Sequence, residues 1–202
     1  MNGVHLIQSR ELFGPLERQA ELREVWAKND ALFTDQTHPT GRSTFAELFR
    51  MCAPGMVNVI TNADIYFERL GAYDIAHHFA IADRLPEEQR HVFALSRWDI
   101  RPDGQAYLWD HGDSQDTYVI YGGPHDIKAD FTQGVAGCDN RLLHVLRAAG
   151  FTVTNPSKTI KTYHLHNVAW RSYLVDPNGK ARGQDKIERI PPPYAFCRPH
   201  EL

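Results

Sequence analysis

The sequence predicts an α/β fold, a single domain with a mixed sheet flanked by helices. Short β-branched runs alternate with segments whose apolar residues recur at helical spacing, and no segment repeats at a fixed period. Of the 202 residues, 42% are hydrophobic and 23% are charged, a composition typical of a globular domain rather than of a membrane-spanning or disordered chain. A chain of this length buries roughly 70% of its unfolded surface, so it needs no disulfide or structural metal to fold.

The first part of the chain predicts strand and helix in alternation. Residues 4–8 form a strand, and a helix over residues 17–29 follows, with apolar residues at helical spacing among charges. Ser43, with Glu47 after it, is the expected N-cap of a second helix. The β-branched run at 56–60 predicts a buried strand that leads into the polar turn Asn62-Ala63-Asp64.

The second part continues the pattern and then changes. The expected elements are a strand at 91–98, a loop at 99–113, a strand at 117–121, a helix at 141–149 and extended segments at 151–154 and 159–166. Residues 167–202 include the turn Pro177-Asn178-Gly179 and the run Pro191-Pro192-Pro193, which fit neither a central strand nor a helix interior. We therefore expect a domain over residues 1–166 and an extended tail that packs on it.

Charge and cysteine content indicate the compartment and exclude some partners. The 22 basic and 25 acidic residues leave a net charge of −3, so electrostatics do not predict binding to duplex nucleic acid. Cys52, Cys138 and Cys197 are odd in number and far apart, which favours reduced thiols. The sequence contains neither a signal-peptide pattern nor an apolar run of about 18 residues. A cytoplasmic protein without a membrane span is the expectation.

Three constellations can carry chemistry. Strand alternation places Asn62 and Asp64 on one face, and likewise His164 and His166, so each pair can direct two ligand atoms toward one ion. Oxygen ligands with an imidazole suit Mg²⁺ or Mn²⁺. The third constellation is Asp139, which precedes a helix. The simpler alternatives are a polar turn for the first pair, an exposed edge strand for the histidines and a helix cap for Asp139.

Two further residues fit a substrate site. Asp116, before a strand, can orient a hydroxyl-bearing substrate or simply end a loop. Arg42, in a turn before a helix, can bind a diphosphate or be an ordinary surface arginine. Walker, Gly-x-Gly-x-x-Gly, Gly-x-Ser-x-Gly and His-Glu-x-x-His motifs are absent from the sequence. Their absence argues against the usual nucleotide hydrolases, dehydrogenases, serine esterases and zinc proteases.

The order of these constellations resembles a known family. The runs Ile-Thr-Asn-Ala-Asp-Ile-Tyr-Phe67, Gly-Cys-Asp-Asn140 and Lys-Thr-Tyr-His-Leu-His166, together with Ala-Leu-Ser-Arg-Trp-Asp99 and Ser-Gln-Asp116, are similar to small uncharacterised glycosyltransferases of microbes and viruses. These are nucleotide-sugar glycosyltransferases of the GT-A type, which have a Rossmann-like mixed sheet. The resemblance covers about residues 4 to 166.

The resemblance implies a role for each motif. Asp64 stands at the second position of the family's Asp-x-Asp metal motif, with Asn62 where the family often has a carboxylate, and His164 or His166 is eligible as the late histidine ligand. Asp139 corresponds to the general base of inverting members. Around the nucleotide, the resemblance assigns Gln8, Ser9 and Arg10 to the base and ribose and Arg42 to the phosphates.

The function implied is metal-assisted transfer of a sugar from a nucleoside diphosphate sugar, most often a UDP-sugar, to an acceptor hydroxyl. Mn²⁺ or Mg²⁺ would be the cofactor, and the acceptor can be a glycan, a lipid, a protein or a modified nucleic acid. Two alternatives remain open at this point: a metal-dependent nucleotidyltransferase, and a binding module without turnover. Because the chain is short, an oligomer or partner protein can complete the acceptor site.

Overall fold

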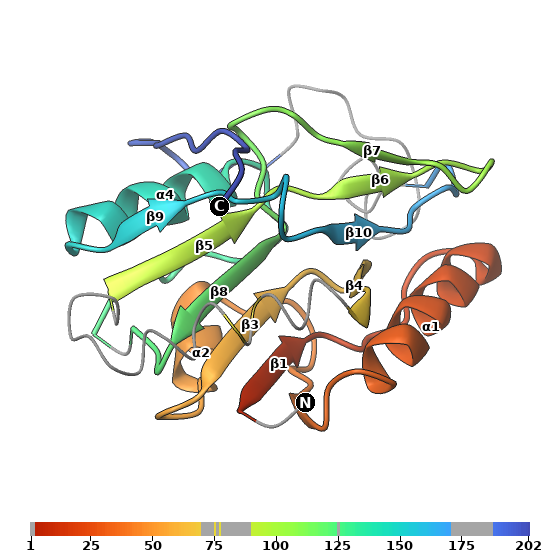
Figure 1. Cartoon of the computed structure of the whole chain (residues 1–202), viewed down its shortest axis with the longest axis horizontal. Helices are drawn as coiled ribbons and strands as arrows, with labels where there is room; N and C mark the ends of the chain where they lie inside the picture. Colours follow the sequence, from red (N-terminus) through yellow and green to blue (C-terminus); the bar gives the residue numbers. More distant parts are fainter. Residues whose placement is uncertain (1–2, 70–74, 76, 78–89, 125, 171–187) are drawn as a thin grey trace.

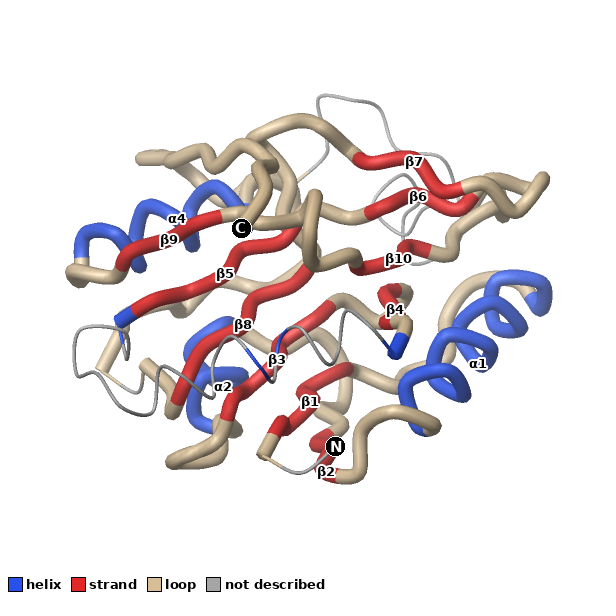
Figure 2. The backbone as a smooth tube through the Cα atoms, in the orientation of Figure 1, coloured by secondary structure: helices blue, strands red, loops and turns tan. Residues whose placement is uncertain are grey.

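The structure is a computed structural model, and it describes residues 3–69, 75, 77, 90–124, 126–170 and 188–202. Two β-sheets form its centre, and helices pack around them (Figures 1 and 2). The predicted α/β class is confirmed. The predicted turn at Pro177–Gly179 lies outside the described residues.

The larger sheet is mixed, as expected. It has the order β2-β1-β3-β8-β5-β9, formed by β1 (Val4–Gln8), β2 (Asp35–Thr37), β3 (Val57–Thr61), β5 (His91–Leu95), β8 (Thr117–Tyr121) and β9 (Thr152–Thr154). β1 runs parallel to β2 and β3, whereas β8 is antiparallel to both of its neighbours. β5 and β9 are parallel to each other. The arrows of β1, β3 and β5 in Figure 1 point toward the second sheet, so their carboxyl ends gather there.

The smaller sheet has the order β4-β10-β6-β7 and corrects three predictions. It consists of β4 (Ile65–Phe67), β6 (Trp98–Ile100), β7 (Ala106–Leu108) and β10 (Thr162–His164). The predicted strand at 91–98 divides, because the backbone N–H of Ser96 bonds to side chains instead of a strand. The predicted loop at 99–113 contains a hairpin whose turn includes Gly104 at φ +81°. The extended segment predicted at 159–166 forms a strand only at its centre.

Three helices are described in full: α1 (Leu16–Asp30), α2 (Phe45–Arg50) and α4 (Cys138–Ala148). Thr44, and not Ser43, caps α2, because its side chain accepts from the N–H of Glu47 while the Glu47 carboxylate accepts from the N–H of Thr44. α4 begins three residues before the predicted start at residue 141. Its early start places Asp139 in the first helical turn.

The core lies on both faces of the larger sheet. One buried cluster joins Ile60 and Tyr118 of the sheet to Phe45 of α2 and Leu142 of α4, so these two helices cover the same face. A second cluster fills the other face, and a third packs α1 against the smaller sheet. No helix among the described residues has the length and apolar character to cross a bilayer.

Residues 188–202, the end of the tail, pack on the domain. Their backbone donates to Ala136, to Asn140 in α4, to Gly112 and to Asn155. Cys197 belongs to the first core cluster, and all three cysteines are buried and free of disulfides. The tail therefore contributes to the core on which it lies.

Candidate metal and substrate site

A pocket of about 800 Å³ opens between the two sheets. Its walls come from the segments that follow β1, β3 and β5, from the segment before β8, from β10 and from the start of α4. The carboxyl ends of β1, β3 and β5 thus supply much of the lining, which is where α/β sheets commonly bind ligands. Sequence positions as far apart as Ser9 and Arg189 meet there.

Asp64, His164 and His166 converge at one side of this pocket. One potential ligand atom from each lies within 4.8 Å of the others. The Oδ2 atom of Asp64 is 3.2 Å from His164 Nε2 and 3.4 Å from His166 Nδ1. β10 pairs antiparallel with β4, and the N–H of Leu165 donates to the carbonyl of Asp64, so backbone pairing sets the two segments in register. The structure brings together both histidines that the sequence offered.

Each imidazole is oriented by a hydrogen bond at the ring nitrogen that does not face Asp64. The Nδ1 atom of His164 lies 2.7 Å from Asp99 Oδ1, and the Nε2 atom of His166 lies 2.7 Å from the carbonyl oxygen of Trp170. Because these oxygens only accept, each of these nitrogens carries the proton. The remaining nitrogen of each ring faces Asp64. Histidine ligands of metals in proteins are typically held in this way.

The charges of this group compensate one another. Burial alone would raise the pKa of Asp64, but His164, His166 and Arg18 hold it well below the ordinary value. Burial lowers the pKa of His164, and Asp64 and Asp99 outweigh this effect and raise it to about 9. Asp64 is therefore an anion at neutral pH, and a metal ion that binds here displaces a proton from His164.

Arg18 was not predicted from the sequence to belong to the site. Its side chain is fully buried in α1, and Nη2 lies 2.5 Å from Asp64 Oδ2 while Nη1 donates to the Leu165 carbonyl. An arginine within an amphipathic helix is usually solvated, so helical periodicity gives no sign of this contact. Glu21, one helical turn later, pairs with the same guanidinium.

Asp139 lies in the pocket, in the first turn of α4, in a different electrostatic setting. Its Oδ1 atom is 3.3 Å from the hydroxyl of Tyr118 and 3.3 Å from Cys138 Sγ. Burial and the negative charge of Asp116 raise its pKa to about 7, although Cys138, Tyr118 and Arg97 lower it in part. A carboxylate with this pKa can accept a proton at neutral pH.

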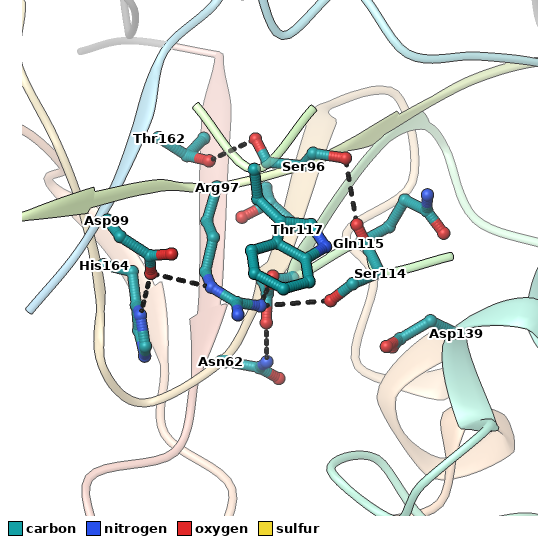
Figure 3. A network of polar contacts seen from close by, with 12 residues as sticks. Asn62, Ser96, Arg97, Asp99, Ser114, Gln115, Thr117, Asp139, Thr162 and His164 are labelled. Carbon is teal, nitrogen blue, oxygen red and sulfur yellow. Dashed lines mark hydrogen bonds and ion pairs between the residues drawn. The ribbon is translucent and has the colours of Figure 1, made fainter. Parts of the chain in front are cut away.

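A polar network lies between His164 of the Asp-His-His group and Asp139 (Figure 3). Arg97 donates from Nε to Asp99 Oδ1 and from Nη1 to Asp116 Oδ2, each at 2.9 Å. Asn62 donates to the other oxygen of Asp116 at 2.8 Å. The prediction that strand alternation places Asn62 and Asp64 on one face is wrong, because β3 ends at Thr61 and the chain turns there. Both residues line the pocket, and a ligand role for Asn62 stays a prediction.

The predicted nucleotide-binding residues divide into two pairs. Ser9 and Arg42 line the pocket. Gln8 and Arg10 do not, because the Gln8 amide is buried and donates to the Asn62 and Ile65 carbonyls, and Arg10 pairs with Asp30 and Gln36. Gln8 and Arg10 thus make contacts within the protein and outside the pocket lining, and their assignment to a nucleotide site stays a prediction.

Comparison with known proteins gives no family assignment. Neither a protein-family model nor a curated protein sequence matches this chain.

Proposed function

We propose that this protein is a metal-dependent glycosyltransferase that moves a sugar from a nucleoside diphosphate sugar to an acceptor hydroxyl. One observation carries the proposal: a single pocket holds a convergent Asp-His-His group and, apart from it, a carboxyl group whose pKa is raised to about 7. Transfer of a sugar needs both, because one group must stabilise the leaving diphosphate and another must take the proton of the attacking hydroxyl.

The donor set of Asp64, His164 and His166 fits a divalent cation. One carboxylate and two imidazoles suit Mn²⁺ and related ions, and Asp99 and the Trp170 carbonyl already orient both rings. When bound, such a cation supplies positive charge that neutralises the departing diphosphate. Asp64 and the two histidines hold and orient it, and Arg18 stabilises the negative charge of Asp64.

Asp139 acts on the acceptor. It takes the proton of the acceptor hydroxyl as that oxygen forms a bond to the anomeric carbon, and the bond from this carbon to the diphosphate oxygen breaks with its electron pair leaving on the diphosphate. The Tyr118 hydroxyl fixes the Asp139 carboxylate by hydrogen bonding. Burial and the charge of Asp116 raise the pKa of Asp139 to about 7, so its basicity is matched to neutral pH.

The test is to incubate the protein with a panel of nucleotide sugars and Mn²⁺ and to identify the product. A glycosyltransferase releases free nucleoside diphosphate, slowly by hydrolysis if no acceptor is present. Release of sugar 1-phosphate from the same donors, or of pyrophosphate from nucleoside triphosphates in a parallel incubation, would instead establish the nucleotidyltransferase alternative. Thermal stabilisation by nucleotide without any turnover would establish a binding module, since a ligand that binds only the native state raises the melting temperature.

A further inference from the structure

Arg97 has one donor group that the described part of the chain leaves unused. Its Nε and Nη1 atoms are fixed by Asp99, Asp116 and Ser114, at 2.9 to 3.0 Å. The Nη2 atom makes no hydrogen bond with any residue in the described part of the chain, and it is not among the buried side-chain atoms without a partner. Arg97 lines the pocket. Two N–H donors on a rigidly held guanidinium are therefore available to a ligand.

Trp109 presents an aromatic surface beside this guanidinium. Its side chain is 37% exposed and lines the pocket, whereas the other three tryptophans of the chain are less exposed. The Arg97 guanidinium carbon lies 5.1 Å from the centre of the indole ring. The indole Nε1 is turned toward Asp113, at 3.4 Å. The ring is thus partly exposed in the pocket and has polar groups at its edge, with the His111 ring packed at a centroid distance of 4.8 Å.

Tyr107 shows that exposure alone does not define this surface. It lies on the same hairpin and is 39% exposed, yet it does not line the pocket. Its hydroxyl donates to Gln105, and the Arg101 guanidinium carbon lies 3.4 Å from the centre of its ring. Trp109 and Tyr107 are therefore a matched pair, with one aromatic ring inside the pocket and one outside.

The local charge favours a neutral ligand over an anion. Three carboxylates, those of Asp99, Asp116 and Asp113, lie around the Arg97 guanidinium and the Trp109 ring, and they outnumber the two adjacent cations, Arg97 and His164. A phosphate would be repelled by this group. A sugar ring suits it, because the apolar C–H groups of one face can stack on the indole while hydroxyls at the rim accept from Nη2.

Arg97 also connects the two functional groups of the pocket. It donates to Asp99, which also binds His164. It donates as well to Asp116, whose charge raises the pKa of Asp139. Figure 3 shows Arg97 between His164 and Asp139. In a transfer reaction the sugar ring must lie between the leaving diphosphate and the attacking hydroxyl. Arg97 lines the part of the pocket between His164 and Asp139, where such a ring would lie.

We infer that Arg97 and Trp109 bind the pyranose ring of the sugar that is transferred. Trp109 supplies the stacking face, and Arg97 supplies hydrogen bonds to the ring hydroxyls. This inference rests on the proposed function for the identity of the ring as the transferred sugar. The binding of a pyranose at Trp109 can be measured without metal, nucleotide or turnover, so the two proposals can fail separately.

Saturation-transfer NMR with a panel of methyl pyranosides tests the inference directly. We expect at least one pyranoside to bind the full-length protein in the absence of metal, with its affinity about five- to tenfold weaker in Trp109→Ala and nearly retained in Trp109→Phe. Tyr107→Ala is the matched control and should bind like the wild type. Absence of binding by every pyranoside, or equal affinity in Trp109→Ala and wild type, would overturn the inference.

Arg97→Lys separates hydroxyl recognition from simple charge. Lysine keeps the positive charge but loses the planar fork, so we expect the same pyranoside to bind about fivefold more weakly. Unchanged affinity in this variant would exclude Arg97 from the ring contact. If pyranosides bind as expected but no nucleotide sugar is turned over, the sugar subsite stands and the proposed transferase function fails.

Discussion

Asp64 and Asp139 line the same pocket, but their surroundings push their proton affinities in opposite directions. Asp64 faces two imidazoles and a buried guanidinium, and its pKa lies well below the ordinary value. Asp139 faces a hydroxyl, a thiol and the charge of Asp116, and its pKa rises to about 7. One carboxyl group is thus a permanent anion, and the other can exchange a proton near neutrality.

This difference teaches which task each carboxylate can perform. A ligand for a cation must stay ionised, whereas a general base must be able to take up a proton during the reaction. Two imidazoles and a guanidinium hold the pKa of Asp64 down, whereas burial and the charge of Asp116 raise the pKa of Asp139 by more than Arg97 lowers it. The assignment of roles therefore rests on the environment of each residue and not on residue type.

Asp64→Asn should have the largest effect. The amide keeps a polar partner for Arg18 but removes the anionic ligand, so we expect Mn²⁺ binding to be lost and transfer to fall by at least about 10³-fold. Isothermal titration with Mn²⁺ measures the first effect. Asp110→Ala, which removes an exposed carboxylate outside the pocket lining, is the control. Wild-type Mn²⁺ affinity in Asp64→Asn would contradict the role of Asp64 as an anionic metal ligand.

Asp139→Asn should reduce transfer by about 10²-fold while leaving Mn²⁺ affinity unchanged, because only the proton acceptor is lost. In the wild type, transfer should rise with pH through about pH 7, as Asp139 loses its proton. The pH–rate profile, with Asp139→Asn assayed in parallel, measures both effects. A variant that retains full transfer, or that loses Mn²⁺ as well, would show that the two carboxylates do not have separate roles.

Asp99→Asn should have an intermediate effect confined to the metal side. Asp99 orients His164 from Nδ1, and loss of such a partner typically weakens metal binding about 10- to 100-fold. Competition titration with a metal indicator gives the affinity. The pKa of Asp139, followed by NMR, should stay near 7. Because asparagine keeps an oxygen that can accept from His164, an Asp99→Asn protein with wild-type affinity would mean that the negative charge of Asp99 is dispensable for metal binding.

Asp139 should also leave a signature in the pH dependence of stability. Its folded-state pKa is higher than that of an unfolded aspartate, so the folded state binds the proton more tightly and is stabilised at low pH. This contribution is lost as pH rises from about 4 through about 7. Denaturant unfolding should therefore show Asp139→Asn gaining stability relative to the wild type over that window. A constant difference across it would contradict the raised pKa.

The smallest effect belongs to a position remote from this chemistry. Thr44→Ala removes the cap of α2 and should cost about 1 kcal/mol, a fall in melting temperature of roughly 2–4 °C. Mn²⁺ affinity should not change. Calorimetry and titration of this variant show whether a modest loss of stability by itself alters the pocket.

The sequence predicted most strands of the larger sheet, but not β2, and it missed the polar network. β1, β3 and β8 are short, mostly apolar and β-branched runs that are almost entirely buried, and such runs give a clear pattern. Arg18 joins the site through a contact with a residue 46 positions away, Asp99 through one 65 positions away, and Arg97 through one 19 positions away. Their residue types are common on surfaces, so no local pattern distinguishes them.

Among the candidate site residues, the histidines and carboxylates were easier to find than the nucleotide residues. Strand alternation brought His164 and His166 to attention, and the structure places both beside Asp64. Gln8 follows the same alternation, but its amide donates hydrogen bonds to the backbone carbonyls of Asn62 and Ile65. Whether a polar side chain at a strand end meets a ligand or the protein itself depends on the packing of a neighbouring segment, which one sequence does not show.

The most direct measurement is pulsed electron paramagnetic resonance of the protein loaded with Mn²⁺. The account predicts modulation from two imidazole nitrogens in the wild type, from one in His166→Gln, and from two again in Asp139→Asn. Failure to detect nitrogen coupling in the wild type, or loss of coupling in Asp139→Asn, would contradict the assignment of the metal to Asp64, His164 and His166.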